Sequence, residues 1–414
     1  MRREVNACRE RQLRVLIFRG GCLKNYIWTA RGLVVGYELA MKRVIFGIVI
    51  SVVSVLCADA APGLPQLTNF TSHSLPEMNA LFEQTNGWLG ADGVYSVALS
   101  PERTLWLFDD TWVGSVRDGK RADATMINNS VAIQEGYREK SKLNFSFGRG
   151  DNGKAASLIT PADGRGWFWP QAGVLIGKRL YVFLSQIEKN GKPGVFGFRY
   201  VGQSLGIISN PNEDPASWKV EQRKLPFSFF SAQRELAFGA AVLLQDDYLY
   251  VFGTDNNLQD AYRSRQMILA RVPPATVEDF STWRFYVDGR WETNPTNASH
   301  LVDHIAAECS VSYLPALTQY VLVYTDNGLS PHILARTAAA PWGPWSDATI
   351  VYTCPEMARD KRIFCYAAKA HSSQGSNDEL VLSYVANSFD FWQVVADARL
   401  YWPRFVSVKV GVRQ

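Results

Sequence analysis

Short runs of alternating or continuously apolar residues recur along the chain past residue 80, and they predict β-strands. Each run is rich in β-branched and aromatic residues and is bounded by Gly, Asn, Asp or Pro. Helical periodicity is nearly confined to residues 77–83 and 355–360, so we expect an all-β chain with short helical turns in loops. The predicted strands are residues 95–99, 104–108, 173–176, 180–184, 240–244, 248–253, 310–314, 320–324, 380–384 and 405–410.

The predicted strands form pairs, and the pairs recur about every 60 to 80 residues, giving roughly five similar units. A third strand follows each pair and often ends near a tryptophan, as at Trp218, Trp283 and Trp345. Sheets that are apolar on both faces bury them by stacking around an axis, which limits exposed edges. We therefore predict a single-domain, five-bladed β-propeller over residues 81–414, with residues 401–410 completing the ring. A two-sheet sandwich is the alternative, but it does not explain five repeats.

The first sixty residues contain a candidate export signal. Met41-Lys-Arg precedes an apolar run over residues 44–56 and then Ala58-Asp-Ala, which is typical of a secretory signal peptide at 41–60. The run is short for a transmembrane helix, although an N-terminal anchor stays open. We expect a secreted or periplasmic protein with no integral membrane segment in the mature chain. Residues 1–40 are interpreted as a non-native or disordered extension, and residues 61–80 as a linker.

The net charge and the cysteines indicate which partners and which disulfide the sequence predicts. The net charge is +4, and the arginines near the N-terminus account for it, so no nucleic-acid partner is predicted. Cys354 and Cys365 flank a short charged loop and are candidates for a disulfide, which leaves Cys309 free and buried. The sequence leaves the oligomeric state open.

Acidic residues stand near the starts of the predicted inner strands, where a propeller would gather them at one mouth of its channel. Asp92 and Glu308 each precede such a strand, and Asp110 follows the strand at 104–108. These three residues are the candidate catalytic groups. The candidate substrate-binding residues are Tyr95, Trp112, Asn129, Trp169, Glu235, Lys369 and His371.

Paired carboxyl groups and aromatic rings suit the hydrolysis of a glycosidic bond. One carboxyl donates a proton to the leaving oxygen while another acts as base or nucleophile, and crowding keeps one of them protonated. We assign Asp92 and Asp110 as the base or nucleophile and its electrostatic partner, and Glu308 as the proton donor. These roles are exchangeable among the three residues. Inversion of the configuration at the anomeric carbon is the preferred outcome. Turn formation by Asp92 and Asp110 is the structural alternative, and Asp109 is interpreted as structural or solvated. A non-catalytic glycan-binding or scaffold propeller is the alternative function.

Several motifs follow one another along the chain. They are Gly87-Trp-Leu-Gly-Ala-Asp-Gly-Val-Tyr-Ser-Val, Leu105-Trp-Leu-Phe-Asp-Asp-Thr-Trp-Val-Gly, Met126-Ile-Asn-Asn-Ser, Phe168-Trp-Pro, Phe238-Gly-Ala-Ala-Val, Glu308-Cys-Ser-Val, Ala368-Lys-Ala-His and Tyr401-Trp-Pro-Arg-Phe. In this order, they resemble the motifs of the DUF4185/DUF5005-type proteins. The resemblance implies a five-bladed propeller akin to the arabinanase and fructosidase clans, with Asp92 and Asp110 as prominent acids.

Some members of the DUF4185 group are endo-D-arabinanases, so the resemblance implies a furanose-containing, arabinan-like polysaccharide or oligosaccharide as substrate. This chain has Gln171-Ala-Gly where an acidic Gly-Asp-Gly is usual, and Ser372-Ser after Ala-Lys-Ala-His. These departures bear on specificity and activity. No cofactor is expected, and a channel calcium stays open because related propellers carry one and Asp and Asn oxygens suit it.

Overall fold

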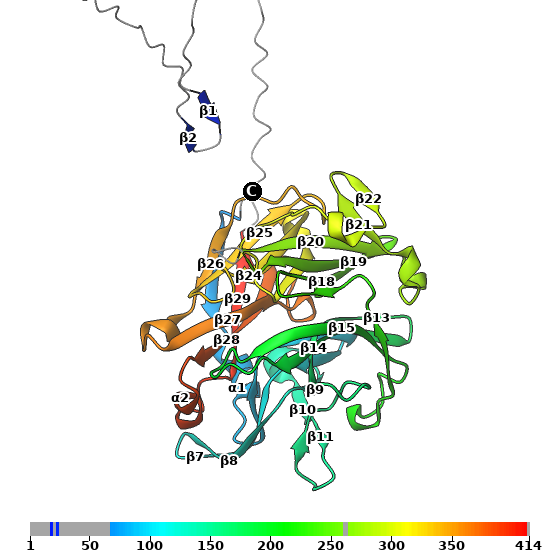
Figure 1. Cartoon of the computed structure of the whole chain (residues 1–414). Coiled ribbons are helices and arrows are strands. Elements are labelled where there is room, and N and C mark those ends of the chain that lie inside the picture. Colours follow the sequence, from blue (N-terminus) through cyan, green and yellow to red (C-terminus); the bar gives the residue numbers. More distant parts are fainter. Residues whose placement is uncertain (1–16, 20–21, 25–66, 260–263, 412–414) are drawn as a thin grey trace, which may run out of the picture. The chain divides into compact units, whose positions relative to one another are not determined.

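The computed structural model describes residues 17–19, 22–24, 67–259 and 264–411 (Figure 1). The chain divides into two compact units, Met1–Ala58 and Asp59–Gln414. In the first unit, β1 (Ile17–Arg19) pairs antiparallel with β2 (Cys22–Lys24). The predicted signal peptide at 41–60 and the rest of the extension at 1–40 lie outside the described residues.

Five antiparallel sheets of the second unit correspond to the five predicted repeats, and Figure 1 labels most of their strands. The first contains β5 (Tyr95–Ser100), β6 (Arg103–Phe108), β9 (Ser130–Glu135) and β10 (Lys142–Ser146). The second contains β13 (Trp167–Ile176), β14 (Arg179–Lys189), β15 (Phe198–Ile208) and β16 (Val220–Lys224). The third contains β17 (Phe229–Phe230), β18 (Arg234–Gln245), β19 (Tyr248–Asn257), β20 (Arg265–Val272), β21 (Arg284–Val287) and β22 (Arg290–Glu292).

The fourth sheet contains β23 (Cys309–Leu314), β24 (Gln319–Thr325), β25 (His332–Ala338) and β26 (Thr349–Thr353), and the fifth contains β27 (Ile363–Ala370), β28 (Glu379–Ser388), β29 (Pro403–Val410) and β3 (Phe70–Ser74). A three-stranded sheet adds β4 (Asn86–Ala91), β7 (Thr111–Arg117) and β8 (Lys120–Ile127), and β11 (Gly148–Arg149) pairs with β12 (Ala155–Ala156). The predicted strands therefore lie within observed ones.

Helices are short, as the sequence predicts. Helix α1 (Pro76–Phe82) begins with a proline at its first turn, where no backbone donor is lost. Helix α2 (Phe391–Ala396) was not predicted, and residues 355–360 form a 3₁₀ turn, Pro355–Ala358. The other 3₁₀ turns are Arg138–Lys140, Pro215–Ser217, Pro274–Thr276, Phe280–Thr282, Pro295–Asn297, Pro315–Leu317 and Ser372–Gln374. In the described part of the chain, no helix has the length and apolarity needed to cross a membrane.

The hydrophobic core lies between consecutive sheets. The middle strands carry buried residues on both faces, as in β14, where residues 180–187 are all buried. One cluster joins the first and second sheets, another the second and third, and another the third and fourth. The remaining cluster joins the fourth, fifth and first sheets. Each sheet is therefore stabilised by apolar contacts with its neighbours on either side.

Neighbouring sheets also contact each other through their inner strands. Strand β5 lies against β13, β13 against β18, β18 against β23, and β23 against β27. The fifth sheet contacts the first again through His371, whose Nδ1 lies 2.8 Å from the Ser96 hydroxyl. The starts of the inner strands are thereby brought to a common region.

The two ends of the second unit share the fifth sheet. Strand β29 is the third strand of this sheet, and β3 pairs with it as the outermost strand. The prediction of a linker over residues 61–80 is therefore wrong from residue 70 onward, because β3 pairs with β29 and α1 packs against it.

The described cysteines are free thiols. Cys309 is buried, as predicted. The disulfide considered for Cys354 and Cys365 is not formed in the structure. Both thiols lie in the same core, and a hydrogen bond between them, together with burial, raises the pKa of Cys354 far above its ordinary value.

Arg121 on β8 anchors the three-stranded sheet to the fifth. Its buried guanidinium donates to the carbonyl oxygens of Leu89, Val394, Asp397, Ala398 and Leu400. Burial lowers the pKa of Arg121 to about 10, which still leaves the group charged at neutral pH. One side chain thus satisfies carbonyls from β4, α2 and the segment before β29.

We predict that Arg121→Met destabilises the protein by about 2–4 kcal/mol, because it leaves several buried carbonyl oxygens without a donor. Urea unfolding of the variant and the wild type measures the difference. Arg117→Met is the matched control, since Arg117 is exposed and pairs only with Asp123 at the surface. Equal unfolding midpoints for the two variants would contradict the anchoring role.

Candidate active site

Two turns of the backbone place three aspartates together. The turn between β4 and β5 carries Asp92, and the turn between β6 and β7 carries Asp109 and Asp110. The Asp92 N–H donates to the Asp110 carbonyl at 3.3 Å, and the Asp109 N–H donates to the Asp92 carbonyl at 3.0 Å. Gly93 has φ +77°, and a Cβ there would lie 2.9 Å from Asp109, so this approach requires glycine.

Asp92 is held by two tyrosines. Its Oδ2 accepts hydrogen bonds from the hydroxyls of Tyr366 (2.5 Å) and Tyr401 (2.7 Å), whereas its buried Oδ1 has no hydrogen-bond partner among the described residues. Burial first, and then the charge of Asp110, raise the pKa of Asp92 to about 8, although the tyrosine hydrogen bonds oppose the shift. Asp92 is therefore a carboxyl that retains its proton at neutral pH.

Asp110 has a different environment. Its Oδ1 accepts from the Trp169 indole at 2.9 Å and from the Asn128 amide at 3.0 Å. Burial raises the pKa of Asp110 to about 6, and these two hydrogen bonds limit the rise. Two neighbouring carboxyls thus lose their protons in different pH ranges.

Glu308 and Asp109 complete the acidic cluster. The Lys369 ammonium lies 3.3 Å from Glu308 Oε1 and also donates to the carbonyls of Ala367 (2.8 Å) and Gly93. Asp109 is buried, and this burial and then the charges of Asp92 and Glu308 raise its pKa well above the ordinary value. The interpretation of Asp109 as solvated is therefore wrong.

The structure brings some predicted substrate-binding residues to the acids. Trp169 binds Asp110 directly, as described above. Tyr95 is buried, with the Lys369 ammonium 4.3 Å from its ring centre. Glu235 accepts from the Asn256 amide at 3.0 Å and lines a neighbouring hollow with Gln171, Tyr200, Phe230, Ala237, Ala240, Thr254, Arg265 and Ala307.

Lys369 and His371 join sheets together, a role that the sequence did not reveal. Both side chains are almost fully buried. His371 Nδ1 lies 2.8 Å from the Ser96 hydroxyl and Nε2 lies 2.8 Å from that of Ser383, which occupies both ring nitrogens. Burial and the charge of Lys369 hold the pKa of His371 well below its ordinary value, so the ring is neutral.

Asn129 and Trp112 also pack within the fold. Asn129 is 1% exposed and bonds to the backbone of Ile159 and Phe168, while its neighbour Asn128 contacts Asp110. Trp112 is buried beneath Phe391, with ring centres 5.4 Å apart. The structure does not bring either predicted side chain to the carboxyl groups.

The residues that sequence reasoning missed are Tyr366, Tyr401 and Asn128. Tyr401 begins one of the motifs and Asn128 lies in another, so the signal was present for both. Tyr366 had no signal of its own, because it lies inside the apolar strand β27.

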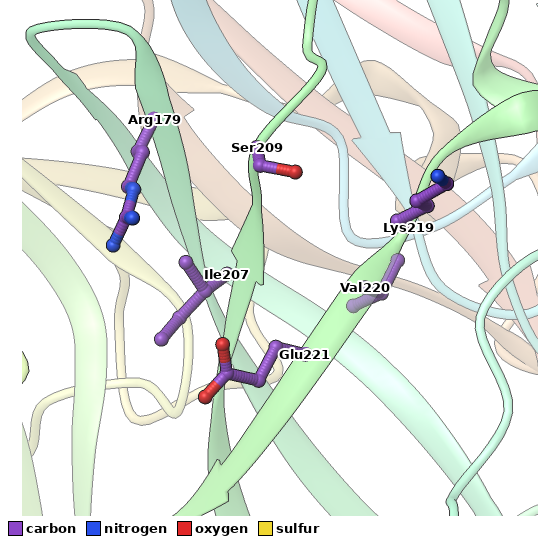
Figure 2. Close-up of a pocket in the computed structure, with 6 residues that line it drawn as sticks. All are labelled: Arg179, Ile207, Ser209, Lys219, Val220 and Glu221. Carbon is purple, nitrogen blue, oxygen red and sulfur yellow. The ribbon is translucent and has the colours of Figure 1, made fainter.

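A second hollow lies on the outer part of the second sheet, away from these residues (Figure 2). Arg179, Ile207, Ser209, Lys219, Val220 and Glu221 line it. It contains none of the predicted site residues. Among residues 67–259 and 264–411, no group of three His, Cys, Asp or Glu side chains has the arrangement of a metal site.

Residues 76–410 match the family model described as Domain of unknown function (DUF5005), a range that covers the five sheets except strand β3. The chain belongs to this family. The resemblance of the motifs to DUF5005 is thereby confirmed, and the site lies wholly within this DUF5005 domain.

Known proteins resemble this DUF5005 chain at low sequence identity. Notoamide biosynthesis cluster protein J' of Aspergillus versicolor is 25% identical over 317 residues, which is 71% of this chain and 78% of that protein. The crystal structure of a candidate hydrolase from Bacteroides ovatus is 18% identical with a TM-score of 0.65, over 82% of this chain and 90% of that one, which shows a common fold. The GH43_1 enzyme of Xanthomonas citri, solved with xylotriose, has a TM-score of 0.41 at 13% identity, over 81% and 93% of the chains.

We predict that the stability of the DUF5005 domain falls between about pH 4 and pH 8 because of Asp92. Its pKa is about 8 in the folded protein and 3.8 ordinarily, so the folded state binds more protons in this range and loses stability as pH rises. Asp92→Asn can still accept the tyrosine hydrogen bonds but carries no charge. The melting temperature of the wild type should therefore decline with pH relative to the variant, by at least about 2–4 °C between pH 5 and 8.

The matched control is Asp118→Asn, because Asp118 is exposed in the β7–β8 turn with φ +50°, which asparagine tolerates. This variant should follow the wild type at every pH. Parallel melting curves for the wild type and Asp92→Asn would show that Asp92 is ionised in the folded protein at neutral pH.

Proposed function

We propose that this chain is an exported glycoside hydrolase with a five-bladed propeller fold, acting on a furanose-containing, arabinan-like polysaccharide. Contacts between successive inner strands, and the return contact of His371 with Ser96, support the propeller. The fold shared with the candidate hydrolase of Bacteroides ovatus is consistent with this activity. The apolar run at 44–56 behind Lys42 and Arg43 supports export.

The proposal rests on two carboxyls, Asp92 and Asp110, whose turns are joined by backbone hydrogen bonds and whose side chains have different neutral donors. Their different pKa values support it. Between about pH 6 and pH 8, Asp110 is ionised while Asp92 keeps its proton. Hydrolysis of a glycosidic bond needs one carboxylic acid and one carboxylate at the same time. Few structural roles require several buried carboxyls to approach each other without ion-pair partners.

The environments suggest a division of roles. The tyrosines occupy Oδ2 of Asp92, so its proton belongs on Oδ1, which is buried and has no hydrogen-bond partner among the described residues. In the proposed mechanism, the leaving oxygen of the bound substrate reaches Oδ1 and accepts this proton. Asp110, held by Trp169 and Asn128, then acts as the base that takes a proton from the attacking water. Water adds to the anomeric carbon as the C–O bond breaks. Asp92 thereby takes the donor role that the sequence analysis gave to Glu308, and Glu308 remains the alternative donor.

We predict that Asp92→Asn and Asp110→Asn each reduce turnover by about 10²–10⁴-fold, because each removes one proton-transfer group. The purified protein is screened against arabinans, arabinogalactan, xylan and fructans with analysis of the products. Replacing the donor should slow natural substrates more than aryl glycosides with good leaving groups, and replacing the base should slow both classes. Asp118→Asn is the control and should retain full activity.

Undiminished turnover in either site variant would remove that residue from the mechanism. Binding of a polysaccharide by the wild type without any cleavage would favour the alternative function, a non-catalytic glycan-binding propeller.

We predict a bell-shaped pH dependence of kcat/KM. Activity should rise as Asp110 ionises near pH 6 and fall as Asp92 loses its proton near pH 8. Initial rates on the cleaved polysaccharide from pH 4 to pH 10 measure both limbs. A profile that keeps rising above pH 9 would contradict the role of Asp92 as donor.

A further inference from the structure

Four exposed aromatic residues lie on the β14–β15 link and at the start of α2. They are Phe196, Phe389, Phe391 and Trp392, which we call the aromatic strip, and they are 49%, 52%, 42% and 73% exposed. Three of them lie within four consecutive positions at the start of α2. Exposed apolar rings in such a group are unfavourable in water and mark a binding surface more often than isolated ones.

The strip is continuous with the acids on two sides. Phe196, in the link between β14 and β15, lies 6.1 Å from Phe389 and 6.2 Å from Phe364, measured between ring centres. Phe364 in turn lies 5.4 Å from Tyr366, which binds Asp92. The β14–β15 link therefore reaches the fifth sheet close to Tyr366, the partner of Asp92.

The second connection leads to Asp110. The rings of Phe196 and Phe198 are 6.5 Å apart, and Phe198 contacts Trp169 edge-on at 4.7 Å. Trp169 binds Asp110 Oδ1. A row of rings thus runs from one acid to the other through the exposed strip.

The strip is held in place by polar contacts. The Asp390 carboxylate caps α2 by accepting from the Trp392 N–H at 3.0 Å, and Arg362 donates to it at 2.9 Å. Arg121 donates to the Val394 carbonyl of α2, and Phe391 packs on Trp112. The rings are therefore preorganised, which reduces the entropy lost on binding.

Hydrogen-bonding groups flank the rings. Arg362 forms a bidentate pair with Asp360 and also binds Asp390, and all three side chains are partly exposed. Aromatic faces contact the C–H faces of a sugar, while guanidinium and carboxylate groups match its hydroxyls. This alternation of ring and charge fits a carbohydrate better than an apolar partner.

We infer that the aromatic strip binds additional sugar residues of a polymeric substrate whose scissile bond lies at Asp92 and Asp110. The inference rests on the proposed function and extends it to a polymer-binding surface. The exposed ring surface amounts to roughly 400–500 Å², judged from the size of aromatic side chains. A stable dimer needs about 800 Å² from each partner, so a second copy of the chain is a poorer occupant.

The test compares binding of polysaccharides by native affinity electrophoresis of the full chain. The probes are branched and debranched arabinan, arabinogalactan and xylan. Trp392→Ala should weaken the retardation of the protein by the bound polysaccharide about three- to tenfold, and Trp392→Phe should restore most of it because a ring remains. Tyr313→Ala is the matched control, since Tyr313 is 41% exposed but packs on Tyr320 of the fourth sheet.

The same variants are then made on Asp92→Asn, which separates binding from cleavage. Loss of retardation in Trp392→Ala on this background supports the inference, even if no polysaccharide is hydrolysed. Absence of hydrolysis would refute only the enzyme activity. Cleavage of a polymer with the same KM in Trp392→Ala and the wild type overturns the inference and leaves the activity standing. It is also overturned if no probe retards the wild type, or if sedimentation shows a dimer that Trp392→Ala dissociates.

Discussion

The burial of the apolar faces of the five larger sheets is the constraint on which this structure depends. The middle strands, such as β14, are apolar on both sides, so a sheet standing alone would expose two apolar faces to water. Packing each sheet between two neighbours removes both faces from solvent, and the hydrophobic clusters follow this order around the fold. Inner strands that contact one another in turn then bring residues distant in sequence to one region. Asp92 and Tyr401, for example, are 309 residues apart in the chain.

The same burial determines the electrostatics of the site. Removal from water raises the pKa of Asp92, Asp109 and Asp110. The hydrogen-bond partners and neighbouring charges of each carboxyl determine the size of this rise. Neutral donors, two tyrosines for Asp92 and an indole and an amide for Asp110, orient the carboxyls without fixing their charge as an arginine would. The groups can therefore change protonation within the physiological range, which an ion-paired carboxyl such as Asp255 cannot, since Arg234 and His300 lower its pKa to about 2.

The sequence predicted the inner and middle strands well because packing on both faces leaves long apolar runs. Outer strands such as β16, with the sequence VEQRK, mix polar and apolar residues and were harder to place. Strand β3 was missed because four of its five residues are exposed and its partner β29 is at the other end of the chain. Local pattern carries no information about such a pairing.

The sequence predicted the carboxyl groups of the candidate site, but it predicted the residues around them less well. Asp92, Asp110 and Trp169 were placed correctly together because strand ends fix their position. Asn129 was chosen where Asn128 makes the contact, because both lie in the link between β8 and β9, where no strand periodicity shows which side chain turns toward Asp110. Lys369 lies on β27 and His371 directly follows this strand, and their side chains contact Gly93 and Ser96, respectively, near the first sheet.

In the proposed function, chemistry and polymer recognition reside in different parts of this fold, and this separation has a kinetic consequence. The acids lie at strand ends locked by backbone hydrogen bonds, whereas the aromatic strip lies on the β14–β15 link and on α2. Rings that contact a sugar distant from the reacting bond stabilise the bound substrate and the transition state equally, so they act on KM, while the carboxyls act on kcat. Sequence changes in the link or in α2 can therefore alter the preferred polymer without moving Asp92 or Asp110, because no backbone hydrogen bond of the two acid turns comes from either element.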